Sequence, residues 1–266
     1  TSVGSIELIH KVAARVARAC RRIGVESVAV HVDPLDARAI HVASCDEAAP
    51  LGDDPAAYLD GAALLEAARA REVHAVHPGY GPLAQDPAFA QSILDAGLIW
   101  VGPSPALLAR VRDRLAVRRA AMECGVRVLL GSDRPITGPQ EALIDVDRID
   151  YPVVLRPVLG IGDDAGAVAR DVAELAEGLA ALDPLEPHGG AYVEQWVERA
   201  RHVEVQLFCT ESVAIPLGDR EVSVRRGDRR VLAESPAAAL EQLRTGDAVR
   251  GAMWEAAAEL ATRLEA

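Results

Sequence analysis

Amphipathic helices and short apolar strands alternate along the first part of the chain. Apolar side chains at Ile9, Val12, Val16 and Cys20 recur every three or four residues, which predicts a helix over 6–23 that ends at Gly24. The same patterns predict helices over 58–70, 87–96 and from 105 onward, and strands over 27–32, 73–77 and 98–101. This alternation indicates a parallel, doubly wound sheet, whose strands we expect to be buried on both faces.

The pattern changes after about residue 110. Helices are expected over 113–124, within 135–149, over 172–182 and over 240–264. The stretch 151–155 is nearly all apolar, which predicts a strand buried on both faces. From residue 191 apolar and polar positions alternate, which predicts an antiparallel sheet with one exposed face, built from strands over 192–197, 202–208, 212–218 and 230–235. We therefore expect two domains, 1–112 and 113–266.

The stretch YPVVLRPVLGIGDDAG at 151–166 combines a strand, a cation and a glycine-rich loop. Arg156 ends the strand, and glycines follow at 160, 162 and 166, an outline typical of phosphate-binding loops. Asp163 and Asp164 oppose that interpretation, because a carboxylate repels a phosphate. An ordinary surface turn is the alternative.

Composition and charge narrow the function classes. Half of the 266 residues are hydrophobic, enough for two domains with real cores, and the net charge of −12 argues against nucleic acid and anionic membrane partners. The four cysteines lie far apart with no CxxC spacing, which favours a reduced cytosolic protein without a cysteine metal site. No apolar run reaches about 18 residues and no signal peptide is evident. We therefore expect a cytoplasmic protein that does not span a membrane.

Several segments in order carry a more specific signal. They include HPGYG at 77–81, the strand and glycine loop at 151–166, YVEQWVERARHVEVQ at 192–206 and GDREVSVRRGDRRVLAESP at 218–236. Together they resemble the biotin carboxylase family of ATP-grasp ligases. The resemblance implies an α/β fold, with a Rossmann-like parallel-sheet domain followed by a partial ATP-grasp α+β domain containing the lid and the start of the C-terminal lobe. Members of that family activate bicarbonate with Mg-ATP and carboxylate biotin on a carrier domain.

The resemblance also implies a set of ATP-contacting positions. Arginines stand at three positions where the family has lysines, glycines remain in the lid loop, and strand residues stand on the adenine side: Arg114, Arg156, Arg230, Gly160, Gly162, Glu194, Gln195, Val197 and His202. A planar guanidinium keeps the charge of a lysine but changes its shape. Each of these positions also has a purely structural alternative. The arginines could be solvated surface residues, Glu194 and Glu204 could be outward-facing strand carboxylates, and His202 could be a histidine whose hydrogen bonds are made at the end of a strand.

Other positions depart from the family. Besides Asp163 and Asp164, Arg225 replaces a glutamine and Asp228 a histidine near the bicarbonate and biotin positions. The family's metal-binding glutamates and catalytic arginines follow the helix at 240–264, so we assign no catalytic and no metal-binding residue. ATP is then the expected cofactor, Mg²⁺ would need a further lobe, and no covalent biotin is expected here. A cut fragment and a natural half-enzyme both remain open.

Two functional hypotheses follow. The first is a biotin carboxylase-like chain of a biotin-dependent carboxylase, which binds ATP and is catalytically defective on its own. The alternative is a non-catalytic scaffold or regulatory subunit that docks on true carboxylase subunits. Expected partners are carboxylase subunits or a second copy, and a biotin carrier domain. An ATP-grasp ligase with another substrate is less favoured. His74 and His77 fall on opposite faces of a strand, so they do not predict a shared metal site.

Overall fold

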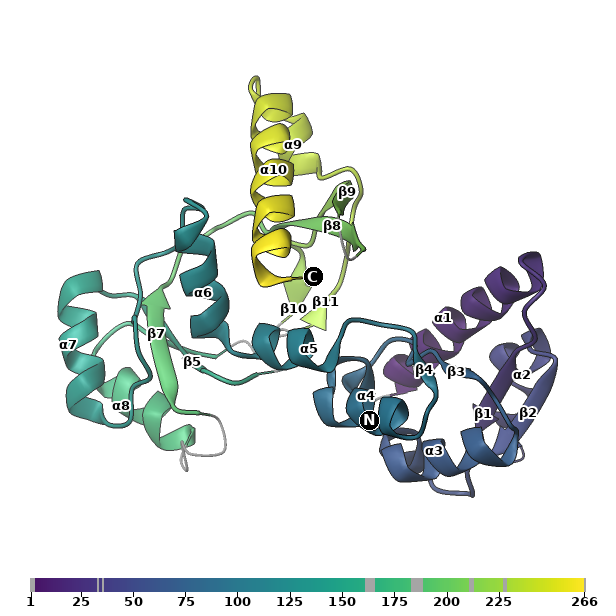
Figure 1. The fold of residues 1–266 in the computed structure, drawn as a ribbon. Coiled ribbons are helices and arrows are strands. Elements are labelled where there is room, and N and C mark those ends of the chain that lie inside the picture. The colour runs from purple at the N-terminus through teal and green to yellow at the C-terminus, as the bar shows by residue number, and fades with distance from the viewer. Residues whose placement is uncertain are drawn as a thin grey trace. The chain divides into compact units, whose positions relative to one another are not determined.

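The computed structural model describes residues 3–32, 34, 36–160, 166–182, 189–210, 213–226 and 229–265 (Figure 1). The chain divides into two compact units, Thr1–Ala109 and Arg110–Ala266. Each unit has its own hydrophobic core. No helix among the residues described is both long enough and apolar enough to cross a bilayer.

The first unit alternates helices with two pairs of parallel strands. In order its elements are α1 (Val3–Arg22), β1 (Val28–His31), η1 (Asp36–Arg38), α2 (Ile40–Ser44), β2 (Glu47–Pro50), η2 (Pro55–Leu59), α3 (Gly61–Ala70), β3 (Ala75–Val76), η3 (Pro82–Gln85), α4 (Pro87–Asp95), β4 (Ile99–Trp100) and α5 (Pro105–Arg112), which runs across the division. Strand β1 pairs with β2 and β3 with β4, both in parallel. The predicted helix–strand alternation is thereby confirmed.

The expectation that these strands are buried on both faces is wrong for β4, whereas no residue of β1 is exposed. Among the described residues the two strand pairs form separate two-stranded sheets rather than one continuous sheet. On β4, Trp100 is 8% exposed and packs edge-to-face on Phe89 of α4, whereas its neighbour Ile99 is 62% exposed. Because α4 packs on one side of this pair, only alternate side chains reach the core.

The second unit begins within α5 and contains three separate antiparallel sheets among the residues described. Its elements are α6 (Arg114–Glu123), α7 (Pro139–Ile149), β5 (Val153–Pro157), β6 (Ala167–Ala169), α8 (Val172–Ala181), β7 (Ala191–Gln195), β8 (Val203–Cys209), β9 (Ala214–Glu221), β10 (Arg225–Arg226), β11 (Arg229–Arg230), α9 (Ala238–Glu241) and α10 (Gly246–Leu264).

Strand β5 lies in the middle of the sheet β6–β5–β7, and both pairings are antiparallel. Val153, Val154 and Leu155 are almost fully buried, which confirms the predicted two-sided burial of this strand. Helices α7 and α8 pack against the sheet and against each other (Figure 1). Gly166 follows the loop with φ +66°, and a Cβ there would lie 2.4 Å from the Leu155 carbonyl oxygen. Only glycine fits this close approach to β5.

Strands β8 and β9 form an antiparallel hairpin with a bulge between Gln206 and Leu207. Helix α10 packs against both strands (Figure 1). Phe208 is 56% exposed and Leu217 63% exposed, in agreement with the predicted exposed face.

The predicted continuous helix over 240–264 is wrong. A short α9 and a separate α10 occupy the region, because the backbone of Gly246 approaches Leu240 so closely that a Cβ would lie 2.0 Å from its carbonyl oxygen. The predicted strand over 230–235 is also wrong. Arg230 ends β11, and Glu234 forms only an isolated bridge with Glu221.

Candidate functional site

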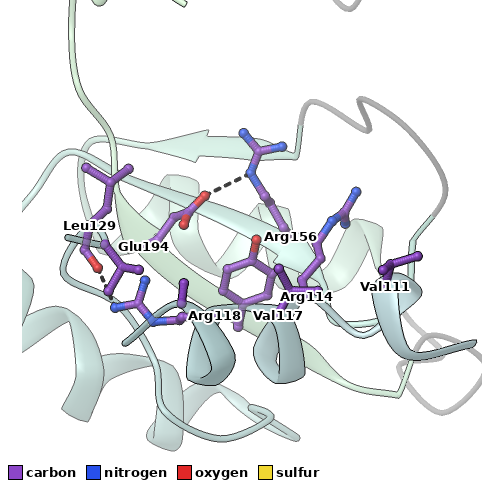
Figure 2. A pocket seen from close by; sticks show the side chains of 10 residues that line it. Val111, Arg114, Val117, Arg118, Leu129, Arg156 and Glu194 are labelled. Atoms are coloured by element: carbon purple, nitrogen blue, oxygen red, sulfur yellow. Dashed lines mark hydrogen bonds and ion pairs between the residues drawn. The ribbon is translucent and has the colours of Figure 1, made fainter. Parts of the chain in front are cut away.

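A pocket of about 450 Å³ opens in the second unit between α6 and the strands β5 and β7 (Figure 2). Its lining combines apolar side chains with three arginines, one tyrosine and one glutamate: Val111, Arg114, Val117, Arg118, Ala121, Val128, Leu129, Arg156, Tyr192 and Glu194. A mostly apolar wall with a few convergent charged groups is typical of a small-molecule site.

Helix α6 positions two of the arginines. The Asp113 side chain accepts from Ala116 N at 2.8 Å and caps the helix, so Arg114 stands in the first turn. Arg118 follows four residues later on the same face. Arg114 donates from its backbone N to Val158 O at 3.1 Å and from Nη1 to Pro157 O at 2.8 Å. These bonds join the start of α6 to the end of β5 and fix this guanidinium at the pocket.

The strands supply the other polar groups. Arg156 of β5 is opposite Tyr192 of β7, and Glu194 is two residues farther along the same strand and therefore on the same face. Arg156 Nε lies 3.2 Å from Glu194 Oε1 in an ion pair, and both side chains are less than a quarter exposed (Figure 2). Arg118 donates to the Leu129 carbonyl. Burial raises the pKa of Tyr192 to about 12, with Glu194 adding to the effect, so the phenol is neutral at pH 7.

The start of the glycine-rich loop passes beside Arg114. The backbone N of Gly160 donates to Arg112 O at 3.3 Å. A Cβ on Gly160 would lie 2.5 Å from Arg114 Nη1, so a larger residue would displace the guanidinium. Gly162, Asp163 and Asp164 lie outside the described residues.

The structure brings four of the predicted positions together, namely Arg114, Arg156, Gly160 and Glu194. It places Gln195 and Val197 elsewhere: Gln195 N donates to Leu130 O at 2.8 Å, and the Val197 side chain is 43% exposed. Neither of them lines the pocket.

His202 and Arg230 meet in a second cluster centred on Glu204. Arg230 Nη2 and Arg220 Nε each lie 2.7 Å from the Glu204 carboxylate, and His202 Nε2 lies 3.6 Å from it. Glu204 therefore forms ion pairs that join β8, β9 and β11, rather than facing solvent as an unpaired strand carboxylate. Arg225 pairs with Arg230 in the β10–β11 ladder, and Asp228 lies outside the described residues.

Sequence reasoning missed Arg118 and Tyr192 as pocket residues. Both carried a signal: Arg118 is one helical turn after Arg114, and Tyr192 is two strand residues before Glu194. It also missed His10, Asp36 and His41 of the first unit, whose potential ligand atoms lie within 4.8 Å of one another. Their positions in the sequence follow no metal-binding spacing.

Residues 9–108 match the biotin carboxylase N-terminal domain. Residues 113–265 match the carbamoyl-phosphate synthase L chain ATP-binding domain, which contains the whole pocket apart from Val111. The chain belongs to the biotin carboxylase family. This confirms the resemblance on which the site residues were chosen.

Curated relatives agree with the assignment. The biotin-dependent acyl-coenzyme A carboxylase alpha3 subunit of Mycobacterium leprae is 34% identical over 234 residues, covering 85% of this chain and 39% of the relative. The biotin carboxylase of Pseudomonas aeruginosa is 32% identical over 245 residues, covering 87% of this chain and 53% of the relative. The chain thus spans about half the length of the curated relatives it matches, or less.

Solved biotin carboxylases share the fold. The biotin carboxylase domain dimer of Hydrogenobacter thermophilus 2-oxoglutarate carboxylase, in complex with MgADP, ADP and bicarbonate, superposes with a TM-score of 0.85 at 26% identity, covering 96% of this chain and 56% of that one. A biotin carboxylase–beta-gamma-ATP complex from Campylobacter jejuni gives a TM-score of 0.86 at 25% identity, covering 95% of this chain and 57% of that one. The α/β fold class expected from the sequence is confirmed.

Proposed function

We propose that this chain is the ATP-binding part of the biotin carboxylase component of a biotin-dependent carboxylase, and that the nucleotide occupies the pocket between α6, β5 and β7. The observation that carries the proposal is the convergence of Arg114, Arg118 and Arg156 on this pocket, within the segment that matches an ATP-binding domain. Biotin carboxylases similar to this chain have been solved with ADP and as a beta-gamma-ATP complex.

The charges of the pocket suit a nucleotide. Three guanidinium groups face one carboxylate, so the lining carries a net charge of about +2 that favours phosphates. Arg114 donates to the Pro157 carbonyl and Arg118 to the Leu129 carbonyl. Arg156 forms an ion pair with the Glu194 carboxylate. A guanidinium is planar and carries five N–H donors, a geometry that suits the oxygens of a phosphate group.

The remaining wall suits the rest of the ligand. Val117, Ala121, Val128 and Leu129 give an apolar surface against which a base can pack. The Glu194 carboxylate can accept from an exocyclic amino group, since an ionised carboxylate only accepts hydrogen bonds. On this proposal Mg²⁺ enters with the nucleotide on its phosphates, which is how this ion is commonly bound.

Calorimetric titration of Mg-ATP and ADP into the purified chain tests the proposal. We expect saturable binding that weakens by at least about tenfold in Arg114→Ala, because a hydrogen bond to a charged group contributes about 1.5–3 kcal/mol. Arg119→Ala is the matched control, since Arg119 is an exposed arginine of the same helix that does not line the pocket.

Circular dichroism must show that Arg114→Ala is folded, because Arg114 also bonds to Pro157 O. Arg156→Ala provides a second test from a different element. The absence of binding by the wild type at millimolar nucleotide would remove the proposal for the isolated chain.

A second candidate is a non-catalytic subunit that docks on carboxylase subunits. It is favoured by the pairing of all three pocket arginines with protein acceptors, which lets the site close on itself without a ligand. Co-purification from the native host discriminates the two. A chain that stays monomeric and recovers no carboxylase partner contradicts the subunit hypothesis, and nucleotide binding by the isolated chain supports the first.

A further inference from the structure

Three polar side chains converge within the first unit and share no residue with the nucleotide pocket. His10 comes from α1, Asp36 from η1 and His41 from α2, and each brings one potential ligand atom within 4.8 Å of the others. His41 is 3% exposed, and the side chains of His10 and Asp36 are 14% and 10% exposed. The group is therefore largely shielded from water and is more than an exposed cluster of acids.

The hydrogen bonding of His41 leaves one ring nitrogen available. His41 Nε2 lies 2.9 Å from the Val30 carbonyl oxygen, which can only accept, so Nε2 carries the proton. Nδ1 then has a lone pair, and it is buried without a hydrogen-bond partner. Burial lowers the pKa of His41. A neutral imidazole that donates its other N–H to a backbone carbonyl is the usual arrangement of a metal-bound histidine.

The partners of His41 are oriented toward the same region. His10 Nε2 lies 3.2 Å from Asp36 Oδ1, but the two do not form an aligned hydrogen bond. The other oxygen of Asp36 accepts from the Tyr58 hydroxyl and, at 3.4 Å, from Val32 N. The Tyr58 hydroxyl and Val32 N thus hold one oxygen of the carboxylate while the other lies beside His10, as the hydrogen bonds behind a carboxylate ligand commonly orient it.

We propose that His10, Asp36 and His41 form a site for a first-row divalent cation of the Zn²⁺ type. Two imidazoles and a carboxylate suit Zn²⁺ better than Mg²⁺ or Ca²⁺, which prefer oxygen ligands. Water would complete the coordination. Since the three residues belong to α1, η1 and α2, a bound ion links these elements and stabilises the first unit.

Binding requires a defined local movement. The His10 and His41 rings are stacked, with centroids 4.2 Å apart and an interplanar angle of 18°. Lone pairs lie in the ring planes, so two parallel rings cannot both point at one ion. The His10 ring must therefore turn out of the stack. His10 Nε2 and Asp36 Oδ1 are already 3.2 Å apart, close to the spacing of about 3.4 Å set by tetrahedral bonds of about 2.05 Å. The ligand atoms that are farther apart than this, at up to 4.8 Å, must move closer together.

Equilibrium titration of Zn²⁺ into the full chain after chelator treatment tests the site. We expect one equivalent to bind, and to bind at least about tenfold more weakly in Asp36→Asn and in His10→Phe, because loss even of an outer-shell partner costs 10–100-fold. His10→Phe retains a ring that can stack on His41. His74→Ala is the control, since His74 is an exposed histidine outside the cluster.

Substitution with Co²⁺ separates this site from the four free cysteines. Visible absorption without a thiolate charge-transfer band is expected for nitrogen and oxygen ligands, and the visible bands should disappear in Asp36→Asn. Absence of Zn²⁺ binding by the folded wild type overturns the proposal. So does binding that both cluster variants leave unchanged, or a Co²⁺ spectrum dominated by thiolate.

Discussion

At the scale of single residues, Glu221 is a buried carboxylate with a full set of donors. Its side chain is 5% exposed and pairs with the Arg201 guanidinium, whose Nη2 lies 2.8 Å from Oε2. Ser223 Oγ and Ala239 N each donate to it at 2.7 Å. Arg201 first, and then these donors, lower the pKa of Glu221 to about 2. Glu221 thereby holds the end of β9 to the start of α9.

This arrangement predicts a pH dependence of stability. The pKa of a glutamate in an unfolded chain is about 4.3, above the folded value. Ionised Glu221 therefore stabilises the fold above about pH 4.3, and this contribution is lost as the pH falls toward about 2. We expect Glu221→Gln to lower the urea midpoint at pH 7 and to reduce the loss of stability between pH 5 and pH 3.

Urea unfolding of both proteins at several pH values measures the effect. Glu198→Gln, which changes an exposed glutamate of the same unit, controls for the change in net charge. Equal midpoints for Glu221→Gln and the wild type at pH 7 would contradict the assigned role.

Residues of the candidate site could be predicted only where they stand at an ATP-contacting position implied by the resemblance to the biotin carboxylase family. Arg114, Arg156, Gly160 and Glu194 were chosen by resemblance, and the fold brings them together. Arg118 was not, although its spacing from Arg114 places both on one helix face. Asp163 and Asp164, whose carboxylates argue against a phosphate site in the sequence, lie outside the described residues.

The histidine–aspartate cluster is a different case. His10, Asp36 and His41 meet only because α1, η1 and α2 pack on one another around the end of β1. No local pattern marks such a set, because the contacts are tertiary.

At the scale of elements, aspartate N-caps recur, and their contribution to the stability of the fold can be measured. Asp171 accepts from Ala173 N and Glu174 N, both at 2.9 Å, and begins α8 from an exposed position. We expect Asp171→Ala to destabilise the second unit by about 0.5–2 kcal/mol, because two backbone donors lose their acceptor. Asp171→Asn should cost little, since asparagine caps helices about equally well.

Denaturant unfolding of the two variants gives the comparison directly. An equal loss of stability in Asp171→Ala and Asp171→Asn would mean that the negative charge at the start of the helix matters more than the capping hydrogen bonds. Two unchanged midpoints would contradict the capping role.

Element ends were predictable where one residue decides them, and strand pairing was not. Gly24, Gly97 and Gly125 follow helices with φ between +71° and +75°, and they end the helices as predicted. The apolar segment around Ile99 suggested burial on both faces, but apolar composition cannot reveal whether a second layer is present. Likewise the division between α9 and α10 depends on the approach of Gly246 to Leu240, a contact without a pattern in the sequence.

At the scale of the whole molecule, two units carry two different candidate sites. The nucleotide pocket is built entirely from residues of the second unit, and the histidine–aspartate cluster entirely from the first. Since a ligand stabilises only the folded form that binds it, each ligand should protect its own unit. The two proposals can therefore be tested in one protein without depending on each other.

Hydrogen exchange followed by peptide mass spectrometry makes this test. We expect Mg-ATP to slow exchange in peptides covering α6, β5 and β7, and Zn²⁺ to slow exchange in peptides covering α1, η1 and α2, because ligand binding suppresses local opening. Arg114→Ala should abolish only the first effect and Asp36→Asn only the second. If protection by Mg-ATP survives both Arg114→Ala and Arg156→Ala, the nucleotide does not bind in this pocket. If Zn²⁺ protects only cysteine-containing peptides outside α1, η1 and α2, the metal site is refuted and the nucleotide proposal still stands.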